Sequence, residues 1–208
     1  MKLNKPEATE QALNILRSGD NFQWYIIFLL VLVLFIYFNE VEKKNWRGIA
    51  AGLMLYMIHW FVEIINALIQ TSLGHALWTV PTGTAFLILI GVGIELSLMF
   101  SIAGLAMSKL LPEDSAEKIG PLPKKLVIGI GNAGLASFIE IFLVMTPTFV
   151  WVWPWWNALT VFILVYIPFF VGAAYAYYWD RKKQKIVIGG LAVINIVMLI
   201  IFIPLGWI

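Results

Sequence analysis

The sequence has no cysteine and few charged residues. None of its 208 residues is Cys, and only 12% are Asp, Glu, Lys or Arg. The lack of cysteine excludes disulfides, thiolate metal sites and cysteine nucleophiles. The net charge is only +2 and no basic, aromatic-rich patch lies outside the apolar runs, so we expect no nucleic-acid partner. Gly-rich phosphate loops, hydrolase triads and zinc-protease motifs are also lacking.

Hydrophobic residues, by contrast, make up 61% of the chain. A soluble domain is roughly half apolar and about a quarter charged, so lipid must cover the excess. A spanning helix needs about 20 mostly apolar residues. The apolar runs of that length cover residues 23–39, 48–69, 84–108, 125–146, 157–179 and 186–206. Because these runs do not alternate with polar residues, as barrel strands do, we expect an all-α polytopic membrane bundle of about six transmembrane helices.

The chain divides into a polar N-terminal stretch and one apolar bundle. We expect residues 1–22 to form an extramembrane tail, within which residues 5–20 suit an amphipathic surface helix, and residues 23–208 to form a single transmembrane domain. Lys and Arg are concentrated in the first, third and fifth connections between the apolar runs. The positive-inside rule places these connections in the cytoplasm. This predicts a multi-pass protein of the cell membrane with both termini extracytoplasmic.

Four ionisable side chains lie inside the expected spans, namely His59, Glu63, Glu95 and Glu140. An ionisable group in hydrocarbon is costly unless it is paired or faces a cavity, and no span contains an internal lysine or arginine to pair with these four. A rise of about 1.5 Å per residue places them in a slab about 10 Å thick. We therefore expect them to share one cavity, where some of the carboxyl groups hold protons or a cation sits among them.

Other polar and aromatic residues are candidates for contact with a bound molecule. Tyr56 and Asn66 lie at helical spacing from His59 and Glu63, on the same face of the second run. The candidate binding residues are Tyr56, Asn66, Trp155, Trp156 and Asn157. The tryptophans of the second and fourth connections also suit an interfacial anchor, and they are Trp78, Trp151, Trp153, Trp155 and Trp156.

Residues 59–63, His-Trp-Phe-Val-Glu, resemble the His-x-x-x-Glu motif of the emopamil-binding family of sterol isomerases. Glu95 is placed like that family's next acid, and Asn-Ala-Leu at 157–159 is similar to the start of its fifth helix, although Thr160 replaces a tryptophan. The resemblance would cover residues 23–179. It implies a proton moved across a ring double bond by the histidine and the glutamates, with an aromatic cage around the carbocation. The chain resembles membrane-bound terpene cyclases about equally.

The sequence is compatible with three functions. The first is an intramembrane isomerase or cyclase of a lipid (sterol or terpenoid) that works by proton transfer, with His59 and Glu63 as the acid pair and Glu95 as base or cation stabiliser. The second is a metal site in which the same residues and Glu140 bind the ion, no other cofactor being expected. The third is a membrane subunit of a larger complex or a proton- or cation-coupled transporter. The expected partners are membrane lipid, a hydrophobic small molecule, a second copy of the chain or partner membrane subunits.

Overall fold

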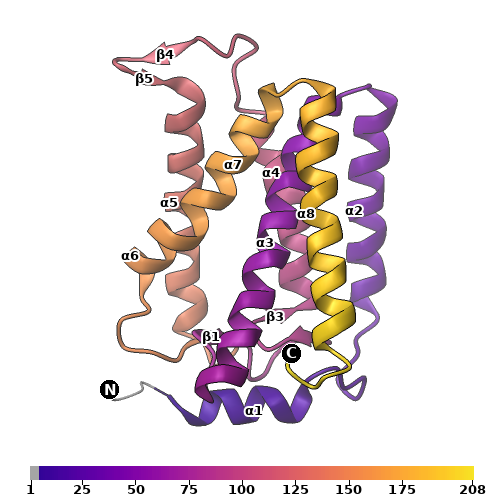
Figure 1. Ribbon diagram of the computed structural model, residues 1–208, viewed down its shortest axis with the longest axis vertical. Helices are drawn as coiled ribbons and strands as arrows, with labels where there is room; N and C mark the ends of the chain where they lie inside the picture. The colour runs from indigo at the N-terminus through magenta and orange to yellow at the C-terminus, as the bar shows by residue number, and fades with distance from the viewer. Residues whose placement is uncertain (1–4) are drawn as a thin grey trace.

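The computed structural model describes residues 5–208, which are mostly helical (Figure 1). The helices are α1 Glu7–Ile15, α2 Tyr25–Glu42, α3 Trp46–Leu73, α4 Ile94–Ser108, α5 Lys124–Val144, α6 Ala158–Val161, the π-helical η1 Phe162–Tyr166, α7 Ile167–Tyr178 and α8 Arg181–Phe202. The strands are short: β1 Trp78–Thr79, β2 Leu87–Leu89, β3 Val92–Gly93, β4 Lys118–Ile119, β5 Leu122–Pro123 and β6 Val150–Trp151. They pair antiparallel as β1 with β6, β2 with β3 and β4 with β5.

The predicted all-α, multi-pass membrane bundle is confirmed. Within residues 5–208, five helices are long and apolar enough to cross a membrane: α2, α3, α5, the continuous helix α6–η1–α7, and α8. The sixth apolar helix, α4, has only 15 residues. The helix expected over residues 84–108 therefore begins later, at Ile94. The preceding residues instead form β2, β3 and the turn between them, which fold back on the end of the bundle.

The bundle is built around α3, which packs against α4, α7 and α8. Glycine permits close approach of α3 and α4, because a Cβ at Gly104 would lie 2.5 Å from the Ala51 carbonyl oxygen. α5 packs mainly against α7 and barely touches α4. In Figure 1, α7 runs obliquely between α3 and α5, and α1 crosses the end of the bundle at which the chain begins and ends. This arrangement leaves a space between α4 and α5 that side chains only partly fill.

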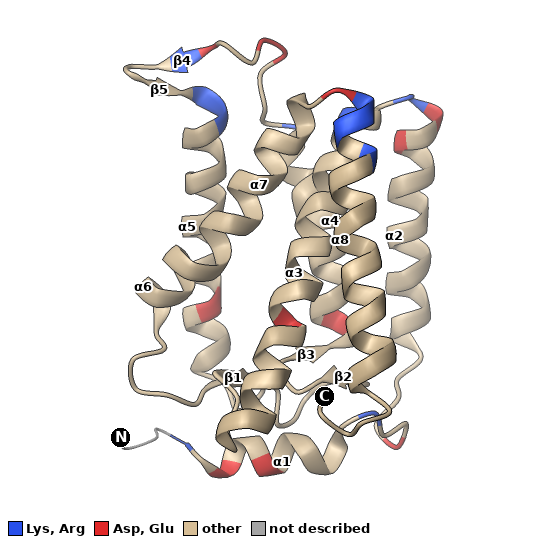
Figure 2. Ribbon diagram, in the orientation of Figure 1, with Lys and Arg blue, Asp and Glu red and all other residues tan. Residues whose placement is uncertain are grey.

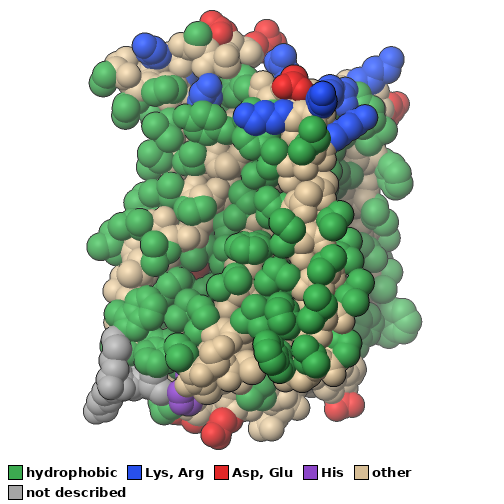
Figure 3. Space-filling view, viewed as in Figure 1, with side chains coloured by type: hydrophobic (Ala, Val, Ile, Leu, Met, Phe, Trp, Pro, Cys, Tyr) green, Lys and Arg blue, Asp and Glu red, His purple; other side chains and the backbone are tan. Residues whose placement is uncertain are grey.

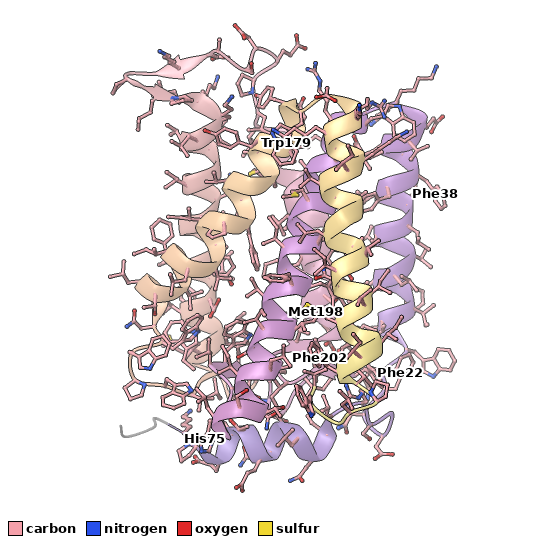
Figure 4. All side chains as sticks on the ribbon, in the orientation of Figure 1. Phe22, Phe38, His75, Trp179, Met198 and Phe202 are labelled. Atoms are coloured by element: carbon pink, nitrogen blue, oxygen red, sulfur yellow. The ribbon has the colours of Figure 1, made fainter. Side chains whose placement is uncertain are left out.

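The surface is apolar between two polar ends. Most of the Lys and Arg residues lie at the end formed by the α2–α3, α4–α5 and α7–α8 connections (Figure 2). Hydrophobic side chains cover the face between that end and the opposite one (Figure 3). Phe38 is typical, because it points away from the bundle and is 68% exposed (Figure 4). Such a surface is suited to contact with lipid hydrocarbon.

Candidate functional site

A cavity of about 390 Å³ lies among α3, α4, α5 and the helix η1–α7. This volume is within the range of about 300–1,000 Å³ that is usual for small-molecule sites. Most of its walls are hydrophobic and aromatic side chains. Its ionisable and indole groups gather in the half nearer β1 and β6, and they come from His59, Glu63, Trp78, Glu140, Trp156 and Tyr166. No lysine or arginine of the described chain lines the cavity.

The cavity opens between α4 and α5. Met99 of α4 and Leu110, just after α4, line it and are 45% and 60% exposed. Leu135 and Ile139 of α5 line it and are 57% and 47% exposed. Residues that both line a cavity and reach the surface mark its opening. Met99, Leu135 and Ile139 lie on apolar helices within the hydrophobic part of the surface, so this part of the opening faces lipid rather than water. Leu110 lies just beyond the end of α4, beside Lys109, so the opening extends toward the basic end.

Glu140, on α5, is buried with both carboxyl oxygens hydrogen-bonded. Trp151 donates its indole N–H to Oε1 at 2.5 Å, and Tyr166 donates its hydroxyl to Oε2. Tyr166 is the last residue of η1, two residues before Pro168. Proline lacks a backbone N–H and crowds the preceding helical turn. A π-helical stretch before it changes the helix register and thereby sets the direction of Tyr166.

Glu63, on α3, is buried but only half satisfied. Its Oε1 accepts the indole N–H of Trp78 at 3.3 Å, while its Oε2 has no hydrogen-bond partner within residues 5–208. His59 lies one turn earlier, with Nε2 3.6 Å from Glu63 Oε1, which is too long for a hydrogen bond. The His59 ring stacks on Phe100 with centroids 4.4 Å apart. Both ring nitrogens of His59 are buried and, in the described chain, unpartnered.

The β1–β6 pair holds the indoles of this site. Trp78 and Trp151 are directly opposite each other in the register, and the backbone N–H of Val152 continues the pairing by donating to the Leu77 carbonyl. The ring of Trp156 stacks on that of Trp78, with centroids 5.2 Å apart. Two segments far apart in the sequence thus supply two tryptophans that line the cavity, Trp78 and Trp156, and a third, Trp151, that bonds to Glu140.

Glu95 lies in the first turn of α4 and does not line the cavity. Its carboxylate accepts the Tyr25 hydroxyl, the Thr84 hydroxyl at 2.6 Å and the Ala85 backbone N–H at 2.7 Å. These partners belong to α2 and to the segment before β2, on the side of α4 away from α5. The expectation that all four ionisable residues share one cavity is corrected: the structure brings His59, Glu63 and Glu140 together and gives Glu95 its own partners.

The candidate binding residues are also divided. Trp156 lines the cavity. Asn66 instead fixes the backbone before and in β1, since its amide accepts the Leu77 N–H and donates to the Trp78 carbonyl. Tyr56 shares a hydrogen bond of 2.9 Å with the Ser97 hydroxyl, on α4. These two residues lie outside the lining, and their predicted contact with a bound molecule stays a prediction.

Two further candidates lie near the start of α6. Asn157 caps this helix, with its side chain accepting the backbone N–H groups of Leu159 and Thr160, and it lies outside the cavity lining. Trp155 is 40% exposed and also outside the lining. A binding role for Asn157 and Trp155 likewise remains a prediction. The observed contacts give Asn157 a structural role, because they satisfy the first N–H groups of the helix.

The sequence gives little indication of the donors to the two cavity acids. Tyr166 carried a weak signal, because a tyrosine just before a proline in an apolar run is placed where the helix departs from regular geometry. The positions of Trp78 and Trp151 in the sequence predict only interfacial anchors. Nothing local in the sequence indicates that they pair across β1 and β6.

The described part of the chain contains no group of side chains arranged to bind a metal ion. No three His, Cys, Asp or Glu side chains of residues 5–208 are grouped so as to hold an ion. Of the four ligands considered, Glu95 lies apart, and the two oxygens of Glu140 are engaged by Trp151 and Tyr166.

Comparison with known proteins identifies the family of the chain. The model of an uncharacterized membrane protein family matches residues 6–204. An uncharacterized protein of Archaeoglobus fulgidus is 42% identical over 201 residues, which are 94% of this chain and 95% of that protein. No solved structure matches the chain.

These matches correct the resemblance to the emopamil-binding sterol isomerases and to the membrane-bound terpene cyclases. Short motifs in an apolar sequence recur by chance, because few residue types are used. The structure also separates Glu95 from the pair His59 and Glu63, although the resemblance treats these three acid–base residues as one set. The family match instead extends over residues 6–204, nearly the whole sequence. The chain therefore belongs to this uncharacterized membrane protein family.

Proposed function

We propose that the protein takes an apolar molecule from the bilayer through the α4–α5 opening and transfers protons to and from it at Glu63 and Glu140. The observation that carries the proposal is the single cavity in which His59 and these two glutamates, from two different helices, meet apolar walls. Ionisable residues inside a membrane protein are costly to retain, so their gathering around a space indicates a function rather than packing alone.

Access from lipid follows from the position of the opening. The exposed lining residues at the opening are Met99 on α4, Leu110 just after α4, and Leu135 and Ile139 on α5, all of them hydrophobic. A water-soluble molecule would have to leave water and cross hydrocarbon to reach such an opening, whereas a lipid-soluble molecule is already there. The substrate is therefore apolar over most of its length.

Proton transfer follows from the chemistry of the lining. A carboxyl group can add a proton to an unsaturated carbon, and a carboxylate can remove a proton from a neighbouring carbon. In this reaction the double bond moves and the substrate keeps the same atoms, because it gains one proton from the first group and loses one to the second. The proton then returns from the second group to the first before the next turnover. Glu63 and Glu140 provide the two groups, and His59 lies 3.6 Å from Glu63 as a third proton-binding side chain.

The test is deuterium incorporation into the molecule that co-purifies with the protein. Purified protein is incubated in deuterated water, extracted with organic solvent and analysed by mass spectrometry. The wild type is expected to add carbon-bound deuterium to its ligand. Glu63→Gln and Glu140→Gln are expected to retain the ligand and to lose most of the incorporation, since an amide neither donates nor accepts the proton at neutral pH. Glu95→Gln is the matched control and is expected to behave as the wild type, because Glu95 lies outside the cavity.

The access route is tested by a bulky residue at the opening. Leu135→Trp fills the space between α4 and α5 and is expected to lower ligand occupancy several-fold. Phe138→Trp is the control, because Phe138 is 57% exposed on the same helix but does not line the cavity. Equal occupancy in both variants, or deuterium incorporation that persists in both glutamine variants, would contradict the proposal.

We also propose that the basic end of the bundle faces the cytoplasm, so that both termini are extracytoplasmic. The support is the concentration of Lys and Arg at the α2–α3, α4–α5 and α7–α8 connections, opposite the end where the chain begins and ends (Figure 2). The half of the cavity that contains the glutamates then lies toward the outer leaflet.

A further inference from the structure

The cavity contains buried polar atoms that no group of the described chain satisfies. They are Oε2 of Glu63, Nδ1 and Nε2 of His59, and Nε1 of Trp156. The three residues are 6%, 1% and 4% exposed. Buried polar atoms in folded proteins nearly always have partners, so these atoms indicate where the polar part of a bound molecule is held.

The unpartnered atoms are mixed in kind. Trp156 can only donate, the carboxylate oxygen of Glu63 accepts, and a neutral histidine presents one donor and one acceptor. A pure hydrocarbon would leave all of them unsatisfied. An ether or ketone could accept from Trp156 but could give no hydrogen to Glu63. An ammonium could donate to Glu63 but would leave the N–H of Trp156 without an acceptor.

Charge and shape restrict the rest of the molecule. A phosphate or sulfate head would lie beside two acids with no Lys or Arg in the lining formed by the described residues. From the polar half of the cavity, the wall of α4 continues through Leu96, Met99 and Ala103, and beyond the helix to Leu110, without a polar side chain. On α5, Asn132 also lines the cavity, but its amide N–H is taken up by the Ile128 carbonyl of its own helix. The remainder of the molecule is therefore hydrocarbon that extends along α4 toward the opening.

We infer that the natural ligand is a hydrocarbon with one uncharged end group that both donates and accepts hydrogen bonds, of which a hydroxyl is the simplest. This inference rests on the proposed function, because it assigns the substrate class of the same cavity. The end group lies between Glu63, His59 and Trp156, where it donates to the carboxylate and accepts from the indole. Glu63, as the carboxylate, is then the group that removes a proton in the proposed reaction, beside the end group, and Glu140 is the carboxyl group that adds a proton to the hydrocarbon body.

The experiment compares four probes that share one saturated chain: a long-chain primary alcohol, its methyl ether, the corresponding alkane and the corresponding amine. Occupancy is measured by native mass spectrometry on the full-length protein from which co-purified ligand has been exchanged. One additional hydrogen bond corresponds to roughly tenfold in affinity. The alcohol is therefore expected to bind about tenfold more tightly than the ether, and the alkane more weakly still.

Glu63→Gln gives a sharper readout than loss of binding. The Trp78 N–H must point at an acceptor, so the amide oxygen of the variant takes the Oε1 position. The amide nitrogen then takes the Oε2 position and presents N–H donors where the carboxylate accepted. The ether should then bind as well as the alcohol in this variant. Trp156→Phe is expected to weaken the alcohol several-fold by removing its donor, while Glu95→Gln and Trp155→Phe, both outside the cavity lining, keep the preference of the wild type.

The outcomes separate this inference from the proposed function. If no probe binds, or if binding is insensitive to Leu135→Trp, the proposed access and the inference both fail. If the probes bind through the opening but the alcohol has no advantage over the ether, or the amine binds most tightly, only the end-group assignment is overturned. An alcohol preference that survives Glu63→Gln unchanged also overturns it.

Discussion

Trp78 and Trp151 are cross-strand partners, and each donates its indole N–H to a different buried glutamate of the same cavity. Trp78 bonds to Glu63 on α3, and Trp151 bonds to Glu140 on α5. Side chains directly opposite each other in an antiparallel pair lie on the same face. The two-residue strands β1 and β6 therefore act as a brace that sets the two acids relative to each other, although α3 and α5 lie on different sides of α7.

Trp151→Phe should destabilise the protein, because it leaves Oε1 of Glu140 without its donor while keeping an aromatic ring in place. A buried acceptor that loses its partner costs about 1–3 kcal/mol. Thermal unfolding in detergent, followed by far-UV circular dichroism, measures the effect. Trp78→Phe should cost less, because its bond to Glu63 is 3.3 Å long, against 2.5 Å for the bond from Trp151.

Trp155→Phe is the control for both indole variants, since Trp155 is 40% exposed and bonds to neither glutamate. Its unfolding temperature should remain close to that of the wild type. An equal loss of stability in all three variants would show that the ring contacts, and not the indole N–H groups, are responsible for the effect.

Gly91→Ala should destabilise the protein, because Gly91, in the turn between β2 and β3, lies against the same end of the cavity. A Cβ at this position would lie 2.5 Å from both the Asn66 amide nitrogen and the Trp78 indole nitrogen, and 2.6 Å from Glu63 Oε2. Overpacking of a buried site costs about 1–3 kcal/mol. Gly131→Ala is the matched control, because its added Cβ would meet no heavy atom of the described chain within 4 Å apart from its own helix backbone and chain neighbours. Removal of a helix-interior glycine should stabilise by up to about 1 kcal/mol. Unchanged stability of Gly91→Ala in the unfolding assay would contradict the observed packing.

The sequence predicts part of the site because helical spacing and depth are local properties. His59 and Glu63 are four residues apart on one apolar helix, so they share a face wherever that helix packs. The positions of Glu63 and Glu140 within their runs also predict similar depths. What the sequence does not contain is the rotation of each helix about its own axis.

Glu95 shows why rotation matters. Its neighbour Leu96 lines the cavity, whereas Glu95 faces Tyr25 and Thr84. One residue turns a side chain by about 100° around a helix, which is enough to exchange one neighbour for another. The roles of Tyr166, Trp78 and Trp151 could not be predicted for a related reason, because their partners are set by packing between segments that lie far apart in the sequence.

Glu95→Leu should destabilise the protein without affecting the cavity. It removes the acceptor for the Thr84 hydroxyl and the Ala85 N–H, which fasten the segment before β2 to the first turn of α4. The expected cost is about 1–3 kcal/mol, measured by thermal unfolding. Glu95→Gln should cost less, since its amide oxygen can still accept and the Thr84 hydroxyl can accept from the amide nitrogen. Loss of ligand from correctly folded Glu95→Gln would instead tie Glu95 to the cavity.

The proposed orientation can be tested with single cysteines, because the natural sequence has none and therefore gives no background. Gln11→Cys places an exposed thiol on α1, and Ala116→Cys and Lys182→Cys place exposed thiols at the basic end. If that end faces the cytoplasm, a membrane-impermeant maleimide should label only Gln11→Cys in intact cells and all three variants after lysis. The opposite labelling pattern would invert the topology. It would then place the half of the cavity that contains Glu63 and Glu140 toward the cytoplasmic leaflet, from which the ligand would have to be drawn.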